Sequence, residues 1–266
     1  MAVITKITVQ QKNKDRYNIF LDGQYAFSVD EDVLIKFNLK KGLELDEFTL
    51  MEIHYQDDIR KAYNRAIQYL TRKMRSEHEV RTHLLEKEVE EPVIQEVIHK
   101  LYEYKFLNDE EYALAFVRTQ MNTTDKGIEV ITRDLKTRGV REAIIEKALK
   151  EYPLDRQVEK ARELWEKVMK KGSRDSERIL KQKAEQHLLR KGFPFEVISL
   201  AIEQAEADKD EDEEWMALTF QGEKAHRKYA KYEGFEYEQK MKQALYRKGF
   251  SLEMIEQFLR QQKDEQ

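Results

Sequence analysis

The chain has 266 residues, of which 38% are charged and 40% hydrophobic, with 9 Gly and 3 Pro. This composition is typical of a helix-rich protein and disfavours a loop-rich all-β fold. It has no Cys, which excludes disulfides and thiolate metal sites and fits a reducing, cytoplasmic location. The formal net charge of −4 argues against a protein that coats nucleic acid by bulk attraction alone.

The N-terminal residues differ from the rest of the chain. A strand is predicted over Ile4–Val9, and alternating apolar residues on both sides of Asp22-Gly23 predict a β-hairpin, because both turn residues tolerate positive φ. Asp30 is expected to begin a short helix that runs through Phe37, and Asp46 is expected to begin another. Residues 1–57 are therefore predicted to form an N-terminal β-hairpin and short-helix cap.

The remainder contains four copies of one helical pattern. Positions 88, 139, 192 and 249 occupy the same place in each copy and lie 51 to 57 residues apart, a period typical of stacked repeats. We assign the repeats to residues 58–109, 110–155, 156–208 and 209–266, each with three helices. The first helices are predicted over Ala62–Met74, Glu111–Met121, Val158–Lys170 and Glu214–Tyr232. The third helices are expected to end near Tyr104, Lys150, Ala207 and Gln261. The predicted fold is mainly α, with tandem three-helix repeats in an elongated curved array behind the N-terminal cap. Such an array favours a binding function over an enclosed active site.

The second helix of each repeat should end at the recurring position. Glycine stands there at 139, 192 and 249, where a left-handed C-terminal residue is least strained. Glu88 stands there in the first repeat, so a different helix end is expected in that repeat. The aromatic residues at equivalent or apolar positions are predicted to lie in the core: Phe106, Tyr112, Phe116, Phe193, Phe250, Trp165 and Trp215.

Charge is unevenly distributed within each repeat. Arg60–Lys87 has 8 basic and 3 acidic residues, and Lys167–Lys191 has 9 and 3, whereas the third helices lean acidic. Stacked in register, the second helices would form a basic stripe suited to phosphates or to an acidic protein surface. The alternative is that these residues only keep the helices in solution and complement the helix dipoles. The acidic run Glu206–Glu214 is expected to be a solvated spacer, a hinge or an electrostatic decoy.

No catalytic or metal-binding pattern stands out. His78 and His83 resemble part of a zinc-peptidase motif, but a spacing of five separates them by about 140° around a helix. There is no glycine-rich phosphate loop, nucleophile elbow or calcium loop. We therefore expect no enzyme activity, no cofactor and no metal. The chain also has no signal peptide pattern and no membrane-length apolar run, so no membrane partner is expected.

Several segments together resemble the RecX family. Arg75–Leu84 is similar to its Arg-Ser-x-x-Glu-Leu-Arg-x-x-Leu signature, and Phe106–Ala113 to its Gly-Tyr-Leu-Asp-Asp-x-x-Tyr-Ala segment. Lys136–Val140 resembles its repeat end, and Leu21–Val29 the hairpin of longer members. The chain departs from the pattern at Phe106 and Asn108, and it has a fourth repeat.

The resemblance implies a regulator that binds the RecA recombinase filament on single-stranded DNA and modulates it in recombination, DNA repair and the SOS response. Members of the family usually inhibit filament extension, ATP hydrolysis and strand exchange, and whether this chain inhibits or assists the filament stays open. A monomer is expected. The candidate binding residues are basic and lie in or beside the second helices: Arg72, Lys73, Arg75, Arg81, Arg133, Lys136, Arg138, Arg190 and Lys191. Two alternatives stay open, namely direct binding of single- or double-stranded DNA and a scaffold for another protein partner.

Overall fold

The chain begins with an antiparallel sheet in the computed structural model, which describes residues 1–172, 174–205 and 211–264. The sheet has the strand order β3-β2-β1-β4, and its strands are β1 (Ala2–Val9), β2 (Arg16–Leu21), β3 (Gln24–Asp30) and β4 (Glu44–Leu45). The predicted hairpin joins β2 to β3, with Asp22 at φ 47° and Gly23 at φ 87°. The predictions of the first strand and of the hairpin are confirmed. Strand β4 was not predicted, because its two residues are too few to show an alternating pattern.

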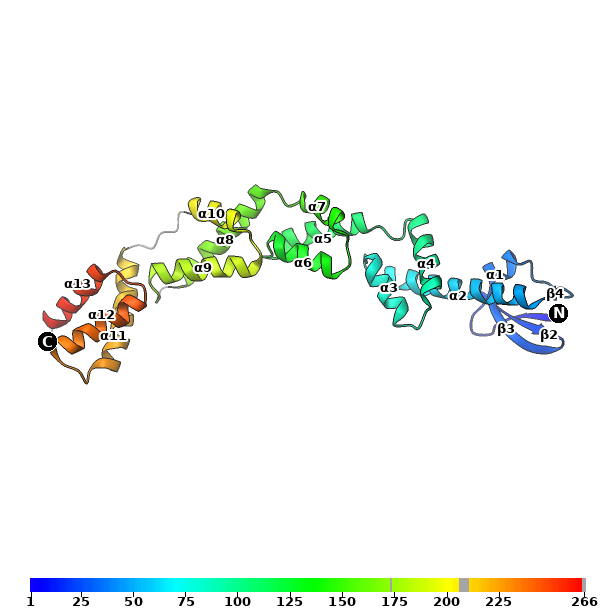
Figure 1. Cartoon of the computed structure of the whole chain (residues 1–266), viewed down its shortest axis with the longest axis horizontal. Helices are drawn as coiled ribbons and strands as arrows, with labels where there is room; N and C mark the ends of the chain where they lie inside the picture. The colour runs from blue at the N-terminus through cyan, green and yellow to red at the C-terminus, as the bar shows by residue number, and fades with distance from the viewer. Residues whose placement is uncertain (173, 206–210, 265–266) are drawn as a thin grey trace. The chain divides into compact units, whose positions relative to one another are not determined.

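Two helices cover this sheet (Figure 1). Helix α1 (Glu31–Lys36) begins where predicted, because the Asp30 carboxylate accepts a hydrogen bond of 3.2 Å from the backbone N–H of Asp32. Helix α2 (Glu47–Leu70) begins in the same way at Asp46. The core between sheet and helices contains the fully buried side chains of Ile4, Ile19 and Ile53.

A buried carboxylate joins the sheet to α2. Asp57, whose side chain is 3% exposed, lies 2.8 Å from Arg16 Nη2 on β2 and 2.9 Å from Lys61 Nζ. It also accepts a hydrogen bond from the backbone N–H of Asp30 at the end of β3. Burial by itself would raise the pKa of Asp57, but these hydrogen bonds outweigh it and hold the pKa below its usual value. The carboxylate therefore stays ionised and fixes α2 against the sheet.

Helix α2 is one continuous helix of 24 residues. The prediction of separate helices from Asp46 and from Ala62 to Met74 is wrong here. No Gly or Pro interrupts residues 47–70, so nothing in the backbone ends the helix. Its first half packs on the sheet through Ile53, and its second half packs in the first repeat through Ile59 and Ala66.

The first repeat is built from α2, α3 (Glu77–Leu85) and α4 (Glu91–Glu103). Val80 and Leu84 of α3 and Val97 of α4 are fully buried against α2. These residues recur at the spacing of an amphipathic helix, which is why the pattern can be read from the sequence. The helices of the second repeat are α5 (Asp109–Thr123), α6 (Ile128–Thr137) and α7 (Glu142–Leu149).

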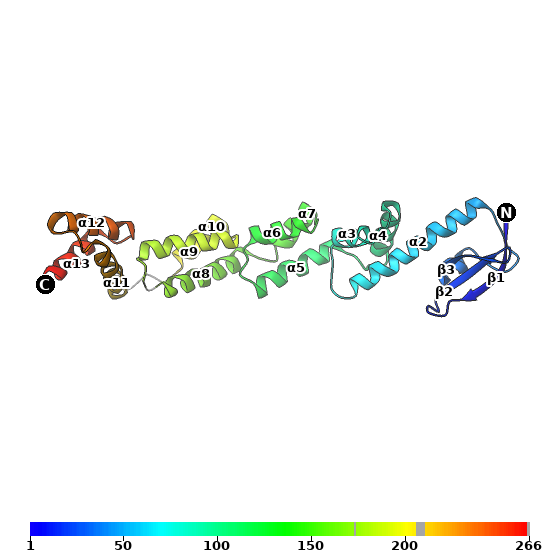
Figure 2. The same cartoon turned by 90° about the horizontal axis from the view of Figure 1, so that it is seen from below.

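The third and fourth repeats each have a core of their own. Helices α8 (Leu154–Lys171), α9 (Glu177–Lys191) and α10 (Phe195–Glu203) surround Trp165, Leu188 and Phe193, and they lie side by side in Figure 2. Helices α11 (Glu211–Tyr229), α12 (Gly234–Arg247) and α13 (Leu252–Asp264) surround Leu218 and Phe250. The repeating three-helix pattern is thereby confirmed.

Some predicted ends move by a few residues. Helix α10 ends at Glu203, before the predicted Ala207, which lies outside the described residues together with Glu206 and 208–210. The rest of the acidic run, residues 211–214, is the first turn of α11. Carboxylates are stabilising there, because the N-terminal end of a helix dipole is positive. In its described part the run is therefore helix and not a spacer.

The second helices all end in the same geometry. Gly139, Gly192 and Gly249 have φ values of 71°, 84° and 97°, and Glu88 has φ 59°. Backbone hydrogen bonds Glu88 N to Leu85 O and Val89 N to Leu84 O repeat the pattern around Gly192. The expectation of a different helix end at Glu88 is therefore wrong. A glutamate adopts the left-handed conformation there at a cost of roughly 1–2 kcal/mol.

The aromatic predictions hold with one exception. Tyr112, Trp165, Phe193 and Phe250 are buried, and Phe116 and Trp215 are partly buried. Phe106 is 54% exposed, so its placement in the core is wrong. Helix α4 ends just before it and Lys105 takes φ 60°, which turns Phe106 outward while Leu107 fills the core position.

Candidate partner-binding surface

A junction of the same kind joins the second helices of successive repeats. In the first, Ser76 is the N-cap residue of α3, and its hydroxyl donates a hydrogen bond of 2.7 Å to the carbonyl of Arg138. Gly139 lies so close to His78 that an added Cβ would approach His78 Cβ to 2.5 Å. The glycine is needed here for this close approach as well as for its positive φ.

The junction recurs twice further along the chain. The Ser176 hydroxyl donates a hydrogen bond of 2.6 Å to the carbonyl of Lys248, beside Gly249. The backbone N–H of Gly127 donates one of 2.7 Å to the carbonyl of Lys191, beside Gly192. In each case the C-terminal end of one second helix meets the N-terminal end of an earlier one. Opposite ends of two helix dipoles then lie together, which is favourable.

A carboxylate from the following first helix completes two of these helix starts. Asp109 Oδ1 accepts a hydrogen bond of 2.8 Å from the backbone N–H of Glu77, and Glu214 Oε2 accepts one of 2.9 Å from that of Glu177. Burial raises the pKa of Asp109, although the hydrogen bond from Glu77 opposes the shift. Asn108 accepts hydrogen bonds from the backbone of Glu110 and Glu111, so it begins α5. The motif at 106–113 is thus largely a structural joint between repeats.

Two candidate cations lie in the turn after α2. Arg72 and Lys73 are exposed, and neither has an ion-pair partner among the described residues. Arg75, next to them, is only 15% exposed: it lies 3.4 Å from Glu79 and 4.2 Å above the ring of Tyr69. Arg72 and Lys73 therefore present their charge to solvent, whereas Arg75 holds the turn against α2 and α3.

Three more candidates, which lie on α3 or at the C-terminal end of α6, have partners within the protein. Arg81 contacts Glu77 at 2.7 Å and Glu91 at 2.9 Å, and Lys136 contacts Glu142 at 2.8 Å. Arg138 is partly buried, and its backbone carbonyl is the acceptor for Ser76. The charges of Arg81 and Lys136 are therefore largely compensated within the protein.

The remaining candidates lie on α6 and α9. Arg133 is exposed on α6. Arg190 is exposed at the end of α9 with no ion-pair partner among the described residues, and Lys191 lies 3.9 Å from Asp125. Across the described chain, the candidates that are both exposed and without an ion pair are Arg72, Lys73 and Arg190.

One hollow was missed by sequence reasoning. It is lined by residues from four places in the chain. These are Lys36 on α1, Arg60 and Tyr63 on α2, Lys100 on α4, and Tyr104 and Phe106 just after α4. No local pattern unites them, because they meet only when the N-terminal cap packs beside the first repeat. Tyr104 and Phe106, two aromatic residues beside a predicted helix end, are the signal that the sequence offers.

The described residues contain no cluster of three or more His, Asp or Glu side chains able to hold a metal ion. His83 stacks on Tyr69 at a centroid distance of 4.0 Å, and burial lowers its pKa. His83 thus packs as part of the first repeat.

Within the part of the chain that is described, no helix is long and apolar enough to cross a membrane.

Models of one protein family match successive parts of the chain. The model "Regulatory protein RecX N-terminal domain" matches residues 2–46, and the first and second three-helix domain models of RecX match residues 62–101 and 108–149. The third three-helix domain model matches twice, at residues 155–202 and 211–259. The double match agrees with the separate cores of the third and fourth repeats.

Curated relatives and solved structures agree with these matches. The chain is 49% identical to proteins named "Regulatory protein RecX" from Bacillus velezensis and from Bacillus subtilis, over 98% of this chain and 99–100% of theirs. A "Crystal structure of regulatory protein RecX" superposes with a TM-score of 0.69 at 38% identity, covering 77% of this chain and all of that one. A RecX structure from Lactobacillus salivarius gives 0.55 at 41% identity, covering 56% of this chain and 97% of that one. By these matches along its length, the chain belongs to the RecX family of regulatory, non-enzymatic proteins.

Proposed function

We propose that the chain binds the RecA recombinase filament on single-stranded DNA and inhibits filament extension, ATP hydrolysis and strand exchange. The observation that carries the proposal is the 49% identity, along nearly the whole chain, to proteins named regulatory protein RecX. The four three-helix repeats add a physical reason, because a partner that is itself a repeating filament can be contacted several times by one chain. Repeated weak contacts then give avidity without any single strong one.

The binding contacts are assigned to the exposed cations of the second-helix regions. Arg72, Lys73 and Arg190 are free to pair with carboxylates or phosphates of the filament. Arg75, Arg81 and Lys136 are paired within their own repeats, and the backbone carbonyl of Arg138 joins two repeats, so these four act indirectly. Arg133 and Lys191 add further positive charge. Binding should weaken as salt rises, since exposed charges are screened over about 8 Å at physiological ionic strength.

The test is inhibition of DNA-dependent ATP hydrolysis by RecA. Reversing three exposed charges together (Arg72→Glu, Lys73→Glu and Arg190→Glu) should weaken inhibition about tenfold, because each exposed ion pair is worth up to about 1 kcal/mol. The matched control reverses three exposed lysines of the N-terminal cap (Lys12→Glu, Lys40→Glu and Lys41→Glu), with the same change of net charge. Circular dichroism verifies that both variants keep their helices. Equal inhibition by the two variants would remove these residues from the binding surface.

A further inference from the structure

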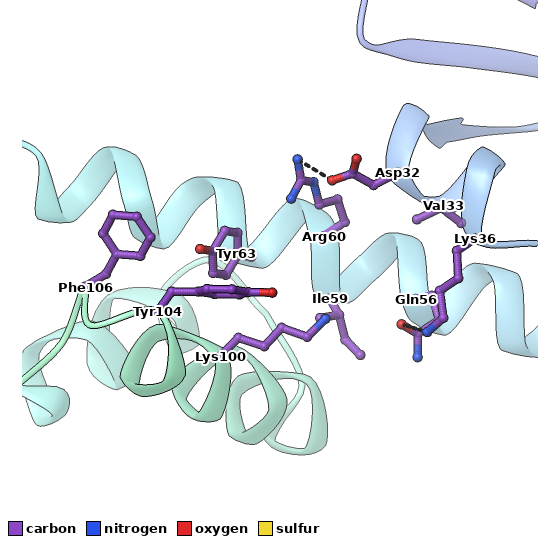
Figure 3. A pocket seen from close by; sticks show the side chains of 10 residues that line it. All are labelled: Asp32, Val33, Lys36, Gln56, Ile59, Arg60, Tyr63, Lys100, Tyr104 and Phe106. Carbon is purple, nitrogen blue, oxygen red and sulfur yellow. Dashed lines mark hydrogen bonds and ion pairs between the residues drawn. The ribbon is translucent and has the colours of Figure 1, made fainter.

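A pocket of about 340 Å³ lies beside α2, between the N-terminal cap and the first repeat (Figure 3). All of its lining residues lie within one compact unit of the chain. Three aromatic rings gather at one end of the pocket and lysine side chains extend toward the other. The pocket therefore combines an aromatic end with a cationic end.

The aromatic end offers exposed ring surface. Tyr104 is 60% exposed and Phe106 is 54% exposed, although both rings would gain about 2 kcal/mol if they were buried. Tyr63 is partly buried and meets Tyr104 edge to face, at a centroid distance of 6.4 Å. Tyr63 thus holds Tyr104 in place, and the outer rings stay open to a planar ligand.

The cationic end carries charge that the protein does not neutralise. Lys100 is partly exposed and has no ion-pair partner among the described residues. Lys36 Nζ is held at 2.9 Å by the neutral side chain of Gln56, which orients the ammonium without cancelling its charge. Arg60 differs, because it is tied to Asp30 at 3.2 Å and Asp32 at 2.7 Å. Lys36 and Lys100 can therefore pair with an anionic group of a ligand.

We propose that this pocket binds nucleotides of single-stranded nucleic acid, with a base stacked on Tyr104 or Phe106 and a backbone phosphate paired with Lys100 and Lys36. A nucleotide is planar and aromatic at one end and anionic at the other, which matches the two ends of the pocket. Stacking needs an unpaired base, so duplex DNA cannot fill the site in this way. The proposal goes beyond recombinase binding, because the contact is with the strand itself and needs no RecA.

The experiment measures binding of the full chain alone to a labelled oligothymidylate of about 16 nucleotides, by fluorescence anisotropy. Tyr104→Ala with Phe106→Ala should weaken binding about tenfold, since each stacked base contributes roughly 1–3 kcal/mol. Lys36→Glu with Lys100→Glu should weaken it similarly. The slope of log K against log salt should also become shallower by roughly 0.7 for each phosphate that these lysines no longer neutralise.

Matched variants control for exposed rings and for charge. Tyr25→Ala with Phe48→Ala removes two exposed rings outside the pocket, and Lys40→Glu with Lys41→Glu reverses two exposed charges outside it. Both controls should bind like the wild type. Tyr104→Phe should also bind like the wild type, because it keeps the stacking surface. Photocrosslinking of the wild type to an iododeoxyuridine oligonucleotide should label Tyr104 or Phe106 without any substitution.

Separate arms identify the ligand. An oligouridylate of equal length shows whether RNA is held as well as DNA, and a duplex competitor should fail to displace the labelled strand. Binding by the pocket variants equal to that of the wild type overturns the proposal and leaves recombinase inhibition unaffected. Loss of RecA binding with unchanged oligonucleotide binding also overturns it, because the pocket would then face protein.

Discussion

At the scale of single residues, the structure separates cations that face solvent from cations that hold the fold. Arg72 and Arg75 stand three residues apart, yet Arg72 is exposed whereas Arg75 lies against Tyr69 and Glu79. Sequence alone gives both the same charge. The difference arises from what lies next to each side chain, so the sequence could indicate which basic residues are candidates but could not rank them.

Glu88 offers a residue-scale test. Its φ of 59° is strained for a residue with a Cβ, and Glu88→Gly should stabilise the protein by about 1 kcal/mol once the greater freedom of glycine in the unfolded chain is subtracted. Urea unfolding measures the difference. The control is Glu86→Gly two residues earlier, where φ is −61° and a loss of about 1 kcal/mol is expected. A loss of stability at both positions would contradict the strain at Glu88.

At the scale of elements, the junctions between second helices explain why glycine recurs. An added Cβ at Gly192 would lie 2.6 Å from Val130 Cγ2, and one at Gly249 would overlap the hydroxyl of Ser176. The N-terminal cap offers Glu88 no earlier second helix to meet, so the same backbone conformation there tolerates a side chain. Positive φ sets the shape of the helix end, and the junction sets the requirement for glycine.

Gly249→Ala tests this distinction. The substitution combines a positive φ with a clash, so it should lower stability by about 2–3 kcal/mol and expose the first amides of α9 to hydrogen exchange. Gly23→Ala is the control, because Gly23 has φ 87° but nothing within 4 Å of an added Cβ. Gly23→Ala should lower the stability by only about 1 kcal/mol. Equal losses at the two positions would show that the junction does not need the close approach.

At the scale of the whole molecule, the first, third and fourth repeats each have a hydrophobic core of their own. The buried residues of the fourth repeat form a cluster separate from that of the third. Stability should therefore be close to a sum over repeats and junctions.

A chain shortened to residues 1–205 tests the independence of the repeats. It should keep the helices of its first three repeats and unfold cooperatively, since the core around Trp165 and Leu188 uses no residue from the fourth repeat. The shortened chain should be less stable than the full chain, because the Ser176 hydroxyl loses its hydrogen-bond acceptor, the carbonyl of Lys248. Far-UV circular dichroism and thermal unfolding measure both. Loss of helix well beyond α11 to α13 would show that the fourth repeat is required for the third.

The sequence by itself determined the hairpin, the three-helix repeats, the positions at which the second helices end and the family. These features depend on local periodicity, on turn residues such as Asp22-Gly23 and on motifs such as Arg75–Leu84, all of which can be read along the chain. Only the tertiary structure decided that α2 is continuous, that Phe106 faces solvent, and that Arg81 and Lys136 are already paired. It also brought Tyr104, Lys36 and Lys100 to one pocket. The reason is physical: burial and ion pairing are set by neighbours from other elements, and a single chain pattern does not state which neighbours those will be.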